Sequence, residues 1–230
     1  LHEAGANILD AAQYTDETTE TFIQRVHVSW DDEQLDHEAL QLTLNPIIEE
    51  FHLNIHIKWL DATNNVAIFV SKEDHCLHDL LLLQRDGALN CQIAMVISNH
   101  PDLQDVAQQF GIPFHYIPIN VETETIQLSM LKEHDIDLIV LARYMQVLRP
   151  EFINQYESRI INIHHSFLPA FAGGKPYHQA HTKGVKLIGA TAHYATEELD
   201  AGPIIEQGII RVSHKDSIQH MIHKGRDIER

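Results

Sequence analysis

Cysteine, basic side chains and long apolar runs are all scarce in this chain of 230 residues. Two cysteines, Cys76 and Cys91, are too few for a disulfide framework to hold a fold of this size. No apolar run approaches the roughly 18 residues that span a membrane. The 16 Lys and Arg against 33 Asp and Glu oppose nucleic-acid binding, because a phosphate backbone needs a basic face. We therefore expect a cytoplasmic protein with neither a membrane nor a nucleic-acid partner.

A metal site is also not supported by the sequence. His75, Cys76 and His78 lie close together and are residue types that bind zinc. Structural zinc needs four well-placed ligands, and no second cluster in the sequence completes this one. We therefore predict that this segment begins a helix after a strand, and we predict no metal.

Residues 1–62 have the pattern of a small α+β unit. Apolar and polar residues alternate from Phe22 to Trp30, which is typical of a half-buried strand. The other predicted elements are strands at Ile8–Tyr14 and Asn54–Leu60 and a helix at Asp36–Phe51. Leu1–Ala4 have the pattern of the end of a helix, which Gly5 stops. One more strand ahead of that helix would complete the ferredoxin-like order βαββαβ, so we expect that this strand is missing.

A small polar linker, residues 61–65, separates this unit from a region of different character. Continuous apolar runs there are typical of strands buried on both faces of a parallel sheet, and they lie at Val66–Val70, Ile93–Ile97 and Leu138–Ala142. Helical stretches alternate with them, at Leu77–Gln84, Pro101–Phe110 and Ile126–His134. Residues 66–230 are therefore predicted to form a doubly wound, Rossmann-like α/β domain. It stops in a helix that we expect to be truncated.

The polar residues that can carry chemistry follow one predicted strand, Ile160–His164. Asn162 and His164 are two residues apart, so they lie on the same face of that strand. An amide can stabilise an oxyanion, and an imidazole can move protons near neutral pH. The pair therefore suits attack on a carbonyl carbon.

A second polar segment combines a strand end with a shaped loop. Thr191 and His193 lie on the strand, and Asp200 precedes Gly202 and Pro203 in the loop. Each signal alone has a simpler interpretation, because a strand histidine is more often structural and an Asp before Ala-Gly-Pro is usually a turn former. Together with the Asn162 segment, these residues form a motif that is much more specific than any of its parts.

The combined motif resembles the formyltransferase-fold enzymes that use 10-formyltetrahydrofolate. It consists of Asn162-x-His164-x-Ser166-x-Leu168-Pro169, Thr191-x-His193 and Asp200-x-Gly202. The resemblance implies that Asn162, His164 and Asp200 are catalytic and that His193 and Thr191 support them. It also implies that folate is the substrate and that no cofactor or metal takes part.

The same resemblance implies folate contacts in two segments. They comprise Tyr144, Met145, Gln146, Val147 and Leu148 after one buried strand, and Ala195, Thr196 and Leu199 before the catalytic aspartate. Backbone groups can read the polar edge of a pterin while apolar side chains cover it. Core packing is the equally weighted alternative for the apolar members.

Within this family the sequence is most similar to the deformylase branch, in which water takes the place of an amine. The double histidine His164-His165 and the segment Pro176–Ala180 carry this likeness. The loop Ser71–Leu77 has no glycine and two carboxylates, which disfavours a substrate phosphate. The resemblance implies hydrolysis of 10-formyltetrahydrofolate to formate and tetrahydrofolate, with the formate used in purine synthesis. In it, Asp200 and His164 activate the water, while Asn162 and protonated His164 stabilise the oxyanion.

Three alternatives remain at this point: a glycinamide ribonucleotide transformylase, a tRNA formyltransferase and a non-catalytic amino-acid sensor. The Ser71–Leu77 loop disfavours the first, the net charge of −17 the second, and the intact catalytic trio the third. The N-terminal unit resembles an ACT domain, which implies an amino-acid effector and a homo-oligomer. The missing first strand puts effector binding in doubt. A few residues are also expected to be missing between Pro118 and Thr125.

Overall fold

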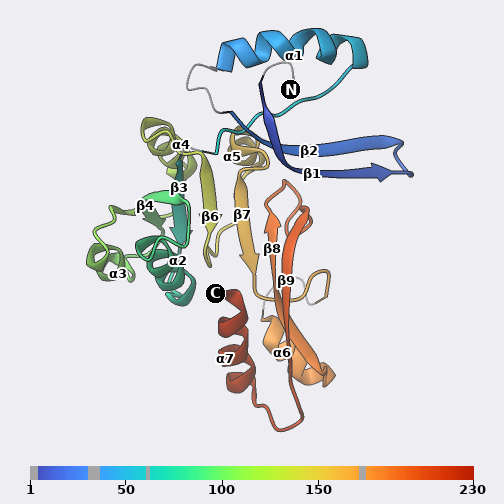
Figure 1. Ribbon diagram of the computed structural model, residues 1–230. Helices are drawn as coiled ribbons and strands as arrows, with labels where there is room; N and C mark the ends of the chain where they lie inside the picture. The colour runs from blue at the N-terminus through green and yellow to red at the C-terminus, as the bar shows by residue number, and fades with distance from the viewer. Residues whose placement is uncertain (1–4, 31–36, 61–62, 171–174) are drawn as a thin grey trace. The chain divides into compact units, whose positions relative to one another are not determined.

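The computed structural model describes residues 5–30, 37–60, 63–170 and 175–230 (Figure 1). The chain divides into two compact units, Leu1–Trp59 and Leu60–Arg230. Of the predicted linker, residues 61 and 62 lie outside the described residues, and Asn64 already belongs to the first strand of the second unit.

The first unit contains a hairpin and one helix. Strands β1 (Asn7–Asp16) and β2 (Thr21–Ser29) pair antiparallel, and α1 (His37–Phe51) follows. The predicted strand at Asn54–Leu60 is wrong, because these residues form no ladder with any described strand. A strand is defined by its ladder to a neighbouring strand, and this segment has none with the described strands.

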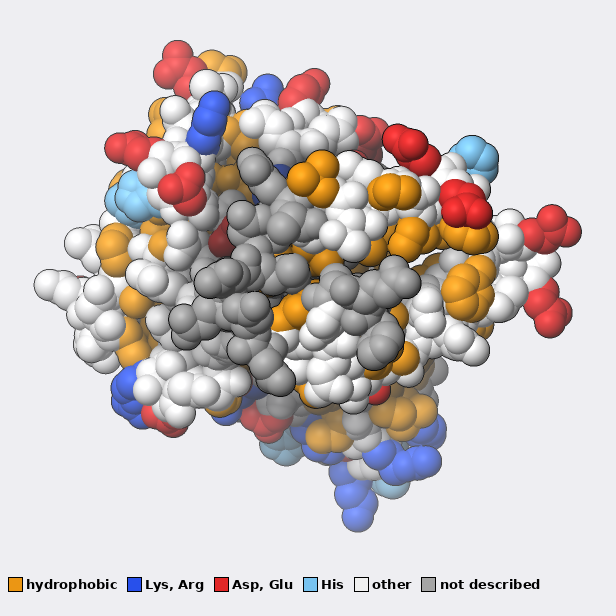
Figure 2. Space-filling view, turned by 45° about the horizontal axis from the view of Figure 1, so that its top comes forward, with side chains coloured by type: hydrophobic (Ala, Val, Ile, Leu, Met, Phe, Trp, Pro, Cys, Tyr) orange, Lys and Arg blue, Asp and Glu red, His pale blue; other side chains and the backbone are white. Residues whose placement is uncertain are grey.

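The hairpin leaves most of its side chains exposed. All of β1 except its last residue is exposed, and on β2 Val26 and Val28 are partly buried while Phe22 is 59% exposed. The predicted half-buried strand is therefore found in its second half. Hydrophobic side chains also reach the surface on the face shown in Figure 2. The exposed apolar residues of the hairpin are Ile8, Leu9, Tyr14, Phe22 and Ile23.

The second unit is built on one seven-stranded sheet in the order β5-β4-β3-β6-β7-β8-β9. The first five strands in that order are parallel, and β8 is antiparallel to both of its neighbours, β7 and β9. Their bounds are Asn64–Val70 (β3), Cys91–Ser98 (β4), Phe114–Tyr116 (β5), Leu138–Leu141 (β6), Ile160–His164 (β7), Leu187–Tyr194 (β8) and Ile204–Arg211 (β9). The strand order reverses between β3 and β6, where open α/β sheets bind ligands.

Helices cover both faces of this sheet, as the continuous apolar runs predicted. Phe69 packs with residues of α4 and α5 on one face, and Ile68 packs with residues of α2 and α3 on the other. The helices are α2 (His75–Arg85), α3 (Gln104–Gln109), α4 (Thr123–Glu133), α5 (Pro150–Ile153), α6 (Pro176–Lys183) and α7 (Ile218–Glu229), with a 3-10 turn at Asn154–Tyr156. The observed fold is thus mixed α/β with a mainly parallel sheet.

The last helix closes the antiparallel side of the sheet. Met221 of α7 lies in a small core with Tyr177 and Ile188. Gly208 of β9 permits this packing, because a Cβ there would lie 2.3 Å from the Ile228 side chain. Among the described residues, no helix is long and apolar enough to cross a membrane.

Candidate active site

Strands β7 and β8 bring the central polar residues together. In the antiparallel register Asn162 faces His193, and His164 faces Thr191. β7 ends at His164, at the same edge where β3 and β6 end, because all three strands are parallel. The candidate site therefore lies at the carboxyl edge of the parallel strands.

The loop that carries Asp200 is held close to this edge by Gly202. A Cβ at Gly202 would lie 1.8 Å from the backbone oxygen of Tyr194, so a larger residue would push the loop away from β8. Asp200 itself has a positive φ of 57°, a conformation that costs an ordinary residue about 1 kcal/mol. Such strain persists where surrounding contacts impose it, often at functional sites.

His164 and Asp200, two members of the predicted catalytic trio, are in direct contact. His164 Nδ1 lies 3.1 Å from Asp200 Oδ1, and both side chains are at least nine-tenths buried. A carboxylate only accepts, so Nδ1 carries the proton and Nε2 has its lone pair free. Nε2 is buried without a hydrogen-bond partner among the described residues. Burial lowers the pKa of His164 more than the Asp200 charge raises it, which favours the neutral imidazole.

His193 holds the amide of Asn162. His193 Nδ1 lies 2.9 Å from the backbone oxygen of Tyr194, so Nδ1 is the donor and Nε2 is left as an acceptor. Asn162 Nδ2 lies 3.1 Å from that Nε2 and donates to it. The second amide hydrogen of Asn162 remains available. His193 Nε2 is also 3.7 Å from Asp200 Oδ1, so His193 lies between the other two polar residues.

Thr191 shapes the turn that follows His164. Its hydroxyl donates to the Ser166 backbone oxygen at 2.9 Å and accepts from the Leu168 N–H at 3.1 Å. Gln207 Nε2 also donates to the Thr191 hydroxyl, at 3.1 Å. Thr191 is fully buried, and its hydrogen bonds fix the turn that follows β7; its supporting role stays a prediction.

The residues predicted to contact folate lie in different environments. The side chains of Tyr144 and Leu148 belong to the core, and the Tyr144 hydroxyl accepts from Gln127 at 3.1 Å. Met145, Val147 and Leu199 are exposed, by 57%, 69% and 62%. Gln146, Ala195 and Thr196 are partly buried. Their contacts with folate stay a prediction.

The loops after β3 and β6 meet through Ser71. Its hydroxyl donates to Asn99 Oδ1 at 2.7 Å and accepts from the Met145 N–H at 3.0 Å. These two loops flank the point where the strand order reverses. Ser71 therefore fixes the predicted Met145 segment against the start of the Ser71–Leu77 loop.

Sequence reasoning named two members of a buried polar cluster beside this point, His75 and Cys76, but missed the third, Glu229. His75, Cys76 and Glu229 offer ligand atoms within 4.8 Å of one another, which is a metal-like arrangement. The chemistry opposes a cation, because Arg143 Nε lies 3.6 Å from Glu229 and burial raises the pKa of Cys76 to about 12. No sequence signal separates Glu229 from the many exposed acidic residues.

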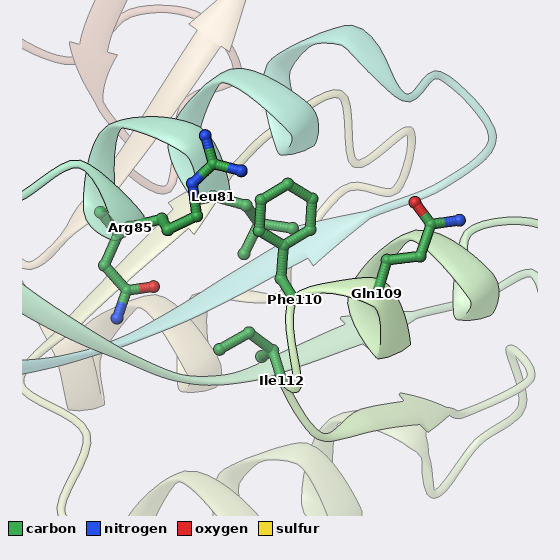
Figure 3. A pocket seen from close by; sticks show the side chains of 6 residues that line it. Leu81, Arg85, Gln109, Phe110 and Ile112 are labelled. Atoms are coloured by element: carbon green, nitrogen blue, oxygen red, sulfur yellow. The ribbon is translucent and has the colours of Figure 1, made fainter.

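A pocket between α2 and the end of α3 has a different character (Figure 3). It is lined by Leu81, Gln84, Arg85, Gln109, Phe110 and Ile112. The Arg85 guanidinium lies over the Phe110 ring, 5.8 Å from its centroid. None of the six lining residues is a carboxylate or a histidine, so this pocket lacks groups for proton transfer.

The chain is similar to known proteins in its sequence. The sequence model described as "Formyl transferase" matches residues 64–230. The formyltetrahydrofolate deformylase of Synechocystis is 48% identical over 100% of this chain and 82% of its own length. That of Bacillus subtilis is 46% identical over 100% of this chain and 78% of its own.

A solved structure is also similar to this chain in its fold. The structure of a formyltetrahydrofolate deformylase from Pseudomonas syringae is 43% identical and superposes with a TM-score of 0.96. That comparison covers 100% of this chain and 78% of the other, so the similarity extends through both units.

Proposed function

The chain belongs to the formyl transferase family, and from that premise we propose that it hydrolyses 10-formyltetrahydrofolate to formate and tetrahydrofolate. The observation that carries the proposal is the contact of 3.1 Å between His164 Nδ1 and Asp200 Oδ1, beside an Asn162 amide oriented by His193. This arrangement offers a base, a group that orients the base, and an oxyanion donor.

The first step is attack of water on the formyl carbon. Neutral His164 accepts a proton from the water at Nε2 while the water oxygen bonds to the carbon. Asp200 holds the other ring nitrogen and stabilises the imidazolium that forms. The carbonyl oxygen becomes an oxyanion, and the free N–H of Asn162 donates to it. One such donor is worth about 10²–10³-fold in rate.

The second step breaks the carbon–nitrogen bond. Protonated His164 returns its proton to the folate nitrogen, directly or through one water, and that nitrogen leaves as a neutral amine. The oxyanion electrons re-form the carbonyl, which gives formic acid. At neutral pH the acid releases its proton and leaves as formate. The resting state of His164 is restored.

A transformylase is the alternative within the same fold. Glycinamide ribonucleotide transformylase 1 from Geobacillus kaustophilus superposes with a TM-score of 0.70 at 28% identity. It covers 73% of this chain, whereas the deformylase from Pseudomonas syringae covers all of it. The loop after β3 opposes a phosphate, since Glu73 and Asp74 lie there.

The deciding experiment follows the formyl carbon. The protein is mixed with formyl-labelled 10-formyltetrahydrofolate, with and without glycinamide ribonucleotide. We expect label in formate at the same rate in both mixtures. Label found mainly in the ribonucleotide would refute the hydrolytic assignment. The His164→Ala variant is the control for release of formate without catalysis.

The finer predictions from the sequence belong to this proposal. The first unit would act as an ACT-like domain that binds an amino-acid effector, and the chain would form a homo-oligomer through residues 1–62. The exposed apolar residues of β1 and β2 support self-association, because neither strand pairs with a further described strand and an open edge favours pairing. Formate supply to purine synthesis and a cytoplasmic location stay predictions.

A further inference from the structure

The carboxylate of Glu229 is surrounded by donors from three other parts of the second unit. His75 Nε2 lies 2.8 Å from Glu229 Oε2, and the Tyr177 hydroxyl donates to Oε1 at 2.8 Å. Arg143 Nε lies 3.6 Å from Oε2. The Glu229 side chain is 2% exposed, so these groups replace water as its partners. We call His75, Arg143 and Tyr177 the anion cradle.

The residues of helix α7 allow the Glu229 carboxylate to reach the anion cradle. Gly225 lies one turn before Glu229, and a Cβ there would lie 1.8 Å from the Tyr177 hydroxyl oxygen. Glycine thus makes room for the hydroxyl that Glu229 binds. The Cys76 thiol donates to the backbone oxygen of Glu229 at 3.5 Å, and Arg226 of α7 pairs with Glu73. The buried Cys76 contact joins the end of α7 to the start of α2, and the partly exposed Arg226–Glu73 pair adds little to it.

Charge in the anion cradle is balanced by this one residue. Burial alone would raise the pKa of Glu229, but the His75 hydrogen bond and the Arg143 charge outweigh it, so the pKa of Glu229 is lowered. Glu229 is therefore ionised at neutral pH. Arg143 Nε and Nη1 are buried without a hydrogen-bond partner among the described residues. The Glu229 carboxylate is the compensating charge for that buried cation.

The anion cradle is connected to His164 through the ring of His165. Arg143 follows β6, the neighbour of β7, and its backbone has a positive φ of 64°. The His165 ring centroid lies 5.4 Å from that of His164 and 6.1 Å from that of Tyr177. A change in Tyr177 therefore reaches His164 through the single ring of His165, while burial and the Arg143 charge both lower the pKa of the two histidines. His75 and Arg143 also follow β3 and β6, whose ends flank the ligand-binding point of this sheet type.

We propose that Glu229 is a positioning residue for the hydrolysis, and that its carboxylate fills an anion site which, once emptied, binds a small external carboxylate. The first half rests on the proposed function, whereas the second does not. Glu229 does not touch the reacting atoms. It keeps Arg143 and Tyr177 in the places that support the His164–His165 pair.

Chemical rescue tests both halves. Glu229→Ala removes the γ-carbon and the carboxylate, which are the heavy atoms of acetate. We expect kcat for formate release to fall at least about tenfold with KM little changed, a loss of about 1.4 kcal/mol of transition-state stabilisation. Sodium acetate at millimolar concentration should restore at least about a third of the lost rate, while sodium chloride at equal ionic strength should not. Acetate is used because formate is the product.

A second readout is independent of activity. Acetate should raise the Tm of Glu229→Ala, because a ligand that binds the folded state stabilises it, and should leave the wild-type Tm unchanged. This shift tests the anion cradle even if the wild-type protein released no formate, which would refute the proposed function alone. No acetate-dependent change in either Tm or rate would overturn the anion site.

Two variants serve as controls. Glu73→Gln removes a partly exposed ion pair between α7 and the loop before α2 and leaves the anion cradle intact, so its kcat should stay within about twofold of wild type. Glu229→Gln keeps the volume and blocks acetate. Its kcat should fall without rescue. If Glu229→Ala does not fold with or without acetate, Glu229→Gln tests the positioning role in its place. A wild-type kcat in Glu229→Gln would then overturn that role.

Discussion

The two units of the chain differ in how far their apolar side chains are buried. Phe69 in β3 has no exposed surface, whereas Phe22 in β2 is 59% exposed. The second unit supplies helices from its own sequence for both faces of its sheet, while the described part of the first unit supplies one helix for a hairpin. A sheet whose faces are covered by helices of the same unit is stabilised within that unit. A sheet with uncovered faces depends on other chain segments or on partners for its stability.

Every residue of the candidate site lies in the covered unit. His164 and Asp200 are at least nine-tenths buried, and Asn162 is partly buried. Catalytic groups need fixed geometry, which a packed core provides. Substitutions in the second unit should therefore change catalysis, and substitutions in the hairpin should change association.

The strongest test of this division is removal of the trio. We expect Asn162→Ala, His164→Ala and Asp200→Ala each to lower kcat by at least about tenfold, and His164→Ala by about 10²–10⁴-fold, because general acid–base catalysis is worth that much. Formate release by purified, folded variants measures this. Near-normal rates in any two of the three would contradict the assignment. A parallel Gln24→Ser variant, on exposed β2, should keep the wild-type rate.

The next effect concerns pH and stability. Burial, followed by the Arg143 charge, lowers the pKa of His165 to about 4 from an ordinary 6.5, although Glu229 opposes this. As the pH falls, His165 is therefore protonated in the unfolded chain before it is protonated in the folded chain. The stabilisation is complete above about pH 6.5 and is lost as pH falls toward 4, by about 3 kcal/mol in total. Urea unfolding between pH 7 and 4 should show a smaller loss of stability in His165→Asn than in wild type.

An exposed histidine provides the control for that experiment. His220 lies on the surface of α7. His220→Asn makes the same chemical change on the surface of α7 and serves as the matched control for the substitution itself. An identical pH dependence in wild type and His165→Asn would mean that His165 is not buried as a neutral group.

The loop of Asp200 should give a smaller, local effect. Gly202→Ala places a Cβ 1.8 Å from the Tyr194 backbone oxygen, so the loop must move and take Asp200 away from His164. We expect kcat to fall about tenfold, the effect of about 1.4 kcal/mol. Ala201→Ser, at the exposed neighbouring position, should keep its rate. An unchanged kcat and Tm in Gly202→Ala would show that the loop tolerates the displacement.

The sequence predicted the second unit well, because local patterns determine it. The continuous run at Val66–Val70 lies in β3, and the strand predicted at Ile160–His164 is β7 with the same bounds. The placement of Asn162 and His164 on one face followed from strand periodicity, and Asp200 lies beside His164. Its approach depends on Gly202, whose role is steric and visible only in three dimensions.

What the sequence could not predict depends on distant segments. Glu229 meets His75 across 154 residues of sequence, and no periodicity connects them. The strand predicted at Asn54–Leu60 had a suitable pattern but no partner among the described strands. An alternating pattern predicts an extended conformation, whereas a strand also needs a neighbour to accept and donate its hydrogen bonds.

The smallest effect on catalysis should come from the hairpin. Phe22 and Ile23 are adjacent in β2, so they point to opposite faces of the hairpin, and they are 59% and 57% exposed. In the double variant Phe22→Ser and Ile23→Ser we expect the unfolding free energy of the second unit to change by less than about 0.5 kcal/mol and kcat to stay within twofold. Light scattering at micromolar concentration should show a smaller average mass than for wild type, because exposed apolar surface and free strand edges drive self-association. Gln24→Ser, a polar change on the same strand, should leave the mass unchanged. A loss of formate release without any change in mass would mean that the hairpin acts on catalysis directly, and the division between the two units would then fail.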